Sequence, residues 1–184
     1  MSRRKIRYAV LAVLAVITLS LVGTSLAIGA GQGGSKVKPQ REFDADLIGH
    51  NEVPAVHTMA QGHLTLTIAP DEQSISYSLT YSGLNSAPLF SHTHFAQPNV
   101  NGAVSFFFCG GGGKPACPAE ATTTPVTGTV VAADVAGITT QGMPAGNLDA
   151  IIQEIREGFA YANLHTTTSP GGEIRGEIRE HHGP

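Results

Sequence analysis

The chain has 184 residues, with 14 acidic and 11 basic side chains and a formal net charge of −3. Four of the basic residues lie in the first seven positions, so the remainder carries seven basic against 14 acidic side chains. An acidic chain with no basic patch among aromatic residues is not expected to bind nucleic acid or anionic lipid. The length fits one domain of ordinary size with short flanking segments.

The first 27 residues have the pattern of an export signal. A basic head precedes the uncharged apolar run Ala9–Ala27, and Ser25 and Ala27 are small residues of the kind that signal peptidase accepts. The run is also close to the roughly 20 residues that span a bilayer. Residues 1–27 are therefore either a signal peptide or an N-terminal membrane anchor. Both alternatives predict a body that is secreted or held in the cell envelope, with membrane contact only through an uncleaved anchor.

Three further segments follow the export signal. Residues 28–41 form a Gly-rich polar linker that cannot bury a core. Residues 42–180 alternate apolar and polar side chains and form the expected folded domain. Residues 181–184 are a polar tail.

Short alternating segments broken by Gly and Pro predict an all-β domain. The clearest is Ser74–Ser82, where Ile75, Tyr77, Leu79 and Tyr81 alternate with Ser and Thr. Many such strands at short spacing indicate an antiparallel Greek-key β-sandwich or barrel. The expected strands are Glu42–Ile48, Gly62–Ile68, Ser74–Ser82, Leu89–Phe95, Val104–Cys109, Thr127–Asp134, Phe159–Thr166 and Glu173–Arg179.

One short helix interrupts this pattern. Its apolar residues follow the i, i+3, i+4, i+7 spacing of a helix with one buried face: Leu148, Ile151, Ile152 and Ile155. Asn147 can cap its start and Gly158 its end. We expect the helix to lie across one open end of the β structure.

Cys109 and Cys117 are the only cysteines, and they flank a Gly-rich loop. In an exported protein the expected outcome is a disulfide that closes this loop. The alternative is a pair of thiolate metal ligands, but metal-binding cysteines usually stand closer together, and a second ligand pair is missing.

The last two expected strands form a hairpin around Ser169-Pro170-Gly171-Gly172, a turn signal. In the first strand Tyr161, Asn163 and His165 share one face. In the second strand Ile174 and Ile178 are expected to be buried. Its charged residues are expected to form a ladder that faces solvent: Glu173, Arg175, Glu177 and Arg179.

His92 and His94 stand at i and i+2 of one strand, so their rings share a face and their Cα atoms lie about 6.6 Å apart. Two imidazoles at this spacing can bind one ion, and His165 could supply a third nitrogen from a neighbouring strand. His63 is a possible fourth ligand. Three neutral imidazoles suit copper or zinc. The alternative is structural, with the rings donating hydrogen bonds to backbone carbonyls.

Two motifs at the ends of the domain carry a family resemblance. Y-x-N-x-H-T, which contains Tyr161 and Asn163, is followed by S-P-G-G-E-I-R-G, which contains Glu173 and Arg175. This pair resembles the C-terminal signature of the CHRD domain, the repeat module named after chordin. F-x-A-x-L-x-G-x-x-E-V-P, which contains Glu52, is similar to the opening of that domain.

The resemblance continues between these ends, with Gly62-His63-Leu64 and the H-x-H of His92 and His94, and covers residues 42–180. One departure is Phe95-Ala96-Gln97-Pro98, where family members usually place a Gly soon after H-x-H. Together with the export signal, the resemblance leads us to expect an exported, non-catalytic CHRD-domain binding module for an unknown extracellular or envelope ligand, one that could hold a metal ion through the His cluster.

The alternative function is a small copper-binding redox protein or a superoxide-dismutase-like enzyme with a related topology. The H-x-H pair with a distant His is similar to the copper site of Cu/Zn superoxide dismutase, another Greek-key β protein. The sequence shows no bridging His in a long loop and no zinc-binding Asp cluster. It also contains no G-x-S-x-G nucleophile motif, so we lean against an enzyme.

Overall fold

The computed structural model describes residues 39–181. The predicted export segment 1–27, most of the linker 28–41 and the end of the tail lie outside the described residues. Within residues 39–181, no helix combines the length and apolar character needed to cross a bilayer.

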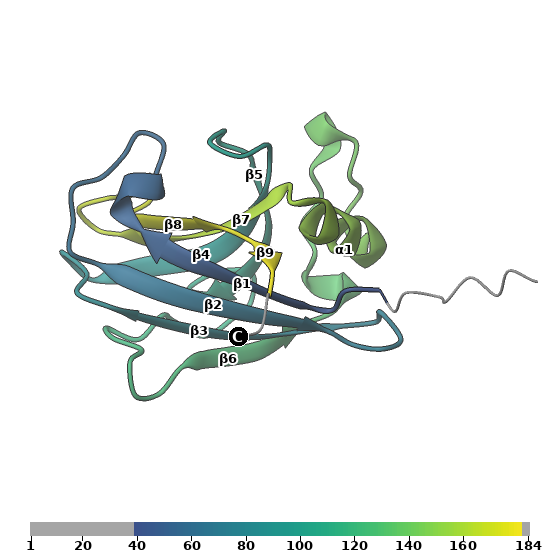
Figure 1. The fold of residues 1–184 in the computed structure, drawn as a ribbon, viewed down its shortest axis with the longest axis horizontal. Coiled ribbons are helices and arrows are strands. Elements are labelled where there is room, and N and C mark those ends of the chain that lie inside the picture. The colour runs from purple at the N-terminus through teal and green to yellow at the C-terminus, as the bar shows by residue number, and fades with distance from the viewer. Residues whose placement is uncertain (1–38, 182–184) are drawn as a thin grey trace, which may run out of the picture. The chain divides into compact units, whose positions relative to one another are not determined.

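The described part of the chain forms one antiparallel sheet of nine strands that curls into a nearly closed barrel (Figure 1). The strand order is β5-β4-β7-β8-β1-β2-β3-β6, and β9 pairs with β1. The expected all-β barrel or sandwich with one short helix is confirmed. The strands are β1 (Glu42–Ile48), β2 (Gln61–Ile68), β3 (Ile75–Ser82), β4 (Pro88–Phe95), β5 (Ala103–Cys109), β6 (Val126–Val130), β7 (Ala160–Thr166), β8 (Ile174–Glu177) and β9 (Arg179–Glu180).

The apolar face of each alternating strand points into the barrel. In β2, Leu64, Leu66 and Ile68 are buried, whereas the intervening His63, Thr65 and Thr67 are exposed. The hydrophobic core also takes residues from β1, β3, β5, β7 and β8. Burial of these side chains, at about 25 cal/mol per Å² of apolar surface, supplies the main driving force for folding.

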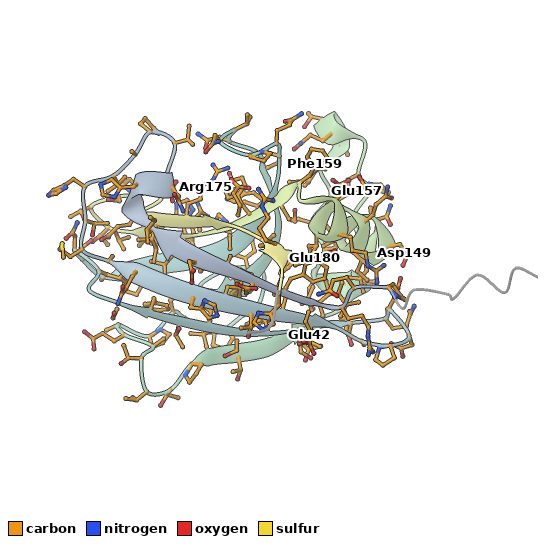
Figure 2. The ribbon with its side chains drawn as sticks, in the orientation of Figure 1. Glu42, Asp149, Glu157, Phe159, Arg175 and Glu180 are labelled. Carbon is orange, nitrogen blue, oxygen red and sulfur yellow. A yellow bond between two sulfur atoms is a disulfide. The ribbon has the colours of Figure 1, made fainter. Side chains whose placement is uncertain are left out.

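The helix α1 (Leu148–Glu157) lies at one end of the barrel and leads into β7 (Figure 1). Its four apolar residues are buried, as the sequence predicts. The Asn147 side chain accepts a hydrogen bond from the Ala150 N–H at 3.1 Å, and Gly158 ends the helix in the left-handed conformation. Asp149 and Glu157 are exposed on its polar side (Figure 2).

The predicted strand Thr127–Asp134 is too long. β6 ends at Val130, and Ala132–Asp134 forms a 3₁₀ turn, η2. The Asp134 carboxylate accepts the Val131 N–H at 2.9 Å and pairs with the Lys114 ammonium at 3.1 Å. These interactions stabilise a turn where the alternation of Val and Ala alone indicates a strand.

The prediction of a solvent-facing ladder in the C-terminal hairpin is wrong for Glu173 and Arg175. Both side chains are fully buried, because loops cover the outer face of the sheet at β8. Glu173 accepts hydrogen bonds from the Thr58 hydroxyl, the Asn85 N–H and the Thr166 hydroxyl, at 2.7–2.8 Å. Its carboxyl group thus links three segments that are distant in sequence.

We expect Glu173→Ala to lower the free energy of unfolding by about 3 kcal/mol or more, because it leaves three donors without an acceptor. Urea denaturation measures the change. Glu180→Ala, at an exposed position of β9, is the control and should change stability by less than about 0.5 kcal/mol. A loss below about 1 kcal/mol for Glu173→Ala would contradict this assignment.

Candidate metal centre

Three histidines meet on the wall of the barrel. His92, His94 and His165 each offer one ring nitrogen, and the three nitrogens lie within 4.8 Å of one another. The pairing of β4 with β7 explains the meeting, since His92 stands opposite Asn163 and His94 opposite Tyr161. The strands of the H-x-H pair and of His165 are therefore neighbours in the sheet.

The cluster lies on the outside of the barrel and is nevertheless buried. Ala160, Ala162 and Leu164 of β7 belong to the hydrophobic core, so the alternating His165 faces away from it. The exposed fractions are 3% for His92, 8% for His94 and 7% for His165. Loops that fold over the sheet therefore enclose the three rings.

Backbone carbonyls fix the orientation of two of the rings. His94 Nδ1 lies 3.0 Å from the Gly102 carbonyl oxygen, and His165 Nδ1 lies 2.9 Å from the Pro170 carbonyl oxygen. A carbonyl only accepts hydrogen bonds, so each Nδ1 carries the proton and each Nε2 keeps a lone pair. This is the arrangement in which an outer hydrogen bond orients a histidine for a metal ion.

Two fully buried ring nitrogens of the cluster have no hydrogen-bond partner. They are His92 Nδ1 and His165 Nε2, and both are buried. His94 Nε2 lies 3.1 Å from Asn163 Oδ1 and so has a polar neighbour. A buried polar atom without a partner costs about 1–3 kcal/mol, which makes these two nitrogens the least satisfied part of the cluster.

The cluster is held in the neutral state. Burial, together with the nearby His94 and His165 rings, lowers the pKa of His92 to about 2. Burial also lowers the pKa of His94 to about 4, against the opposing effect of its hydrogen bonds, and lowers the pKa of His165. Neutral imidazole is the form that binds metal ions, so no proton has to leave these rings at neutral pH.

Aromatic rings pack around the cluster. Phe90 stacks on His92 with ring centres 5.2 Å apart, and Phe107 meets the same ring edge-on at 5.0 Å. Tyr161 stacks on His94 at 4.5 Å and also carries the Arg175 guanidinium carbon 3.4 Å from its ring centre. These contacts restrict the rotamers of the imidazoles and exclude water.

The predicted disulfide between Cys109 and Cys117 is present, and it closes the loop beside this wall. Gly111 and Gly112 of the loop lie against the Phe107 ring, where a side chain at either position would collide with it. The disulfide loop therefore supports the ring that packs against His92.

The other predicted site residues have different positions. His63 lies on the outer face of β2, half exposed, with Nδ1 2.7 Å from Asp46 Oδ1, and the structure does not bring it to the cluster. Asn163 and Tyr161 contact His94 directly. Glu52 is buried beside Asn163, which helps to stabilise its ionised form.

Several groups that surround or orient the three histidines have no clear signal in the sequence. The carbonyl groups of Gly102 and Pro170 are backbone atoms, and any residue type could present them. Phe90 could have been found, because it stands two residues before His92 on the same strand face. The register shifts in the pairing of β4 with β5 at both histidines could not have been found from the sequence.

The barrel domain matches a known protein family. The family model of the CHRD domain matches residues 43–178, which span the barrel, the three histidines and the buried polar residues around them. No curated protein and no solved structure matches the chain.

We expect the metal-free protein to lose stability as the pH falls below about 6.5. The unfolded chain then protonates its histidines near that pH, whereas the folded protein keeps His92 and His94 neutral down to about 2 and 4. Each such histidine contributes a slope of up to about 1.4 kcal/mol per pH unit in this window.

His92→Gln should have a shallower fall in unfolding free energy between about pH 6 and pH 4. Urea denaturation with a chelator, at several pH values, measures the slope of the unfolding free energy against pH for both proteins. The carboxyl groups contribute equally to the two slopes, so their contribution cancels in the difference. Equal slopes for the two proteins would contradict a neutral, buried His92.

Proposed function

The chain belongs to the CHRD domain family, and from this premise we propose that it is an exported, non-catalytic binding module that holds one copper or zinc ion through His92, His94 and His165. One observation carries the metal assignment. The two buried nitrogens without partners, His92 Nδ1 and His165 Nε2, belong to two of the three histidines that each have a ring nitrogen within 4.8 Å of the others.

The donor set favours copper or zinc. Three neutral imidazoles with no carboxylate in the group suit these ions and do not suit calcium or magnesium, which require oxygen ligands. Nitrogens bound at about 2.0–2.1 Å to one ion lie about 3–4 Å from each other. The three nitrogens now lie within 4.8 Å of one another, and small side-chain movements would bring them to that shorter separation.

The structural alternative explains the cluster less well. If the histidines served only to pin the sheet by hydrogen bonds, each buried ring nitrogen should have a partner. Gly102 and Pro170 satisfy one nitrogen each of His94 and His165. The second nitrogen of His165 has no partner, whereas the second nitrogen of His94 lies 3.1 Å from Asn163 Oδ1. A bound ion would satisfy His92 Nδ1 and His165 Nε2 together.

A non-catalytic role is favoured over the copper redox or superoxide-dismutase-like alternative. Catalysis at a metal ion needs an open coordination position that the substrate can reach. The three rings are buried beneath loops and aromatic side chains, and no ring is more than 8% exposed. This enclosure suits an ion that is stored or that stabilises the fold.

Two features support export. Residues 1–27 have the pattern of a signal peptide or membrane anchor. The disulfide between Cys109 and Cys117 is of the kind that persists in oxidising compartments outside the cytoplasm. The proposed location is therefore the cell envelope or the extracellular space, where the module would meet its ligand.

Metal titration of the chelator-treated protein tests the proposal. We expect one equivalent of copper or zinc by calorimetry and elemental analysis, and a rise in melting temperature on loading. His165→Ala should weaken binding by more than about 100-fold, because loss of even an outer hydrogen-bond partner costs about 10–100-fold.

His63→Ala is the matched control, since His63 is a half-exposed histidine on the outer face of another strand, and it should bind the ion as the unchanged protein does. No stoichiometric ion, or equal binding by His165→Ala, would refute the metal site. Superoxide turnover by the copper-loaded protein above that of free copper would favour the enzyme instead.

A further inference from the structure

A second site, separate from the histidines, is formed around Glu52. This residue lies in the loop after η1 (Gly49–Asn51) and is only 5% exposed. A cavity of about 380 Å³ lies between this loop and the turn after β7, and Glu52 lines it together with Val53, Val56, Asn101 and Ser169. This volume is within the range of small-ligand pockets.

The Glu52 carboxyl group has an unused acceptor. Its Oε1 atom is buried and has no hydrogen-bond partner. The carboxyl group lies against Gly172, where a side chain would overlap with both of its oxygens, and Gly172 also lines the cavity. The backbone at Gly172 has φ +123°, a conformation that favours glycine. The turn is therefore shaped to hold this carboxyl group at the wall of the cavity.

Arg175, the cation that acts on Glu52, makes its hydrogen bonds to other groups. Arg175 of β8 attracts the carboxylate, but its guanidinium donates to the Asn101 side chain, the Val100 carbonyl and Glu177. Burial raises the pKa of Glu52 to about 7, against the opposing effects of the Val53 N–H, Arg175 and Asn163. A ligand that brings a positive charge and an N–H donor would therefore offset the desolvation of this carboxyl group.

The other walls define the rest of the ligand. Val53, Pro54 and Val56 present apolar surface, and Ser169 adds a hydroxyl. A hydrocarbon stem can pack on the apolar wall while its charged end reaches the carboxylate. A single carboxylate is too few oxygen ligands for a divalent cation. We propose that this cavity binds a primary alkylammonium group, such as the side chain of lysine.

Titration by ¹H–¹⁵N NMR, with chelator present so that the result does not depend on the metal site, tests this proposal. The probes are n-butylammonium and Nα-acetyl-lysine-N-methylamide, and 1-butanol is the uncharged control of similar length. Both ammonium probes should shift the amide signals of Val53, Asn101 and Gly172 in a saturable manner, and 1-butanol should not.

Glu52→Gln should weaken binding of the ammonium probes at least tenfold. Gly171→Leu is a second variant that keeps the carboxyl group, since a Cβ at Gly171 meets no atom within 4 Å and the residue lines the cavity. Gly171→Leu should also weaken binding of the ammonium probes. If Glu52→Gln does not fold, this variant alone tests whether the cavity is the binding site.

The two ammonium probes distinguish the source of the group. Tighter binding of the lysine derivative indicates a polypeptide partner, and equal binding indicates a free amine; both results support the site. The absence of saturable shifts, equal binding of 1-butanol, or unchanged affinity in the folded variants would overturn the proposal.

Discussion

The antiparallel pairing of β4 with β7 is the constraint on which the rest of the site depends. It places His165 beside His92 and His94, although more than 70 residues separate them in the sequence. The same pairing sets Tyr161 against His94 and Asn163 against His92. Because backbone hydrogen bonds hold the register, the imidazoles are positioned by the sheet, and the outer carbonyl groups only have to set their tautomers.

A buried polar layer outside the barrel is the second feature of this fold. The hydrophobic core fills the interior, while Glu173, Arg175 and the histidines lie between the outer wall and the loops that cover it. Polar groups buried in this way are stable only when they are hydrogen-bonded, and Glu173 meets that condition with three donors. Within the described residues, six buried side-chain atoms do not meet it, in Glu52, His92, Thr93, His165, Arg175 and Glu177. Those of His92 and His165 belong to the proposed metal site, and that of Glu52 belongs to the proposed ammonium site.

The sequence predicted the barrel because alternation reports which residues share a strand face. It predicted β1 and the shared strand face of His92 and His94 for this reason. The caps Asn147 and Gly158 followed from their residue types, and the approach of His165 depended on strand pairing, which alternation does not report. Alternation does not report what covers a face. The charged residues of the last hairpin resemble a solvent-exposed ladder, and only the tertiary structure shows that loops bury Glu173 and Arg175. The same limit applies to His63, which lies on an uncovered part of the outer wall.

The most direct test of the central claim is X-ray absorption spectroscopy at the metal edge of the protein loaded with one equivalent of zinc. The account predicts three imidazole nitrogens at about 2.0–2.1 Å from the ion and two in His165→Ala. A zinc environment made only of oxygen ligands, or one with an imidazole count that His165→Ala leaves unchanged, would contradict it.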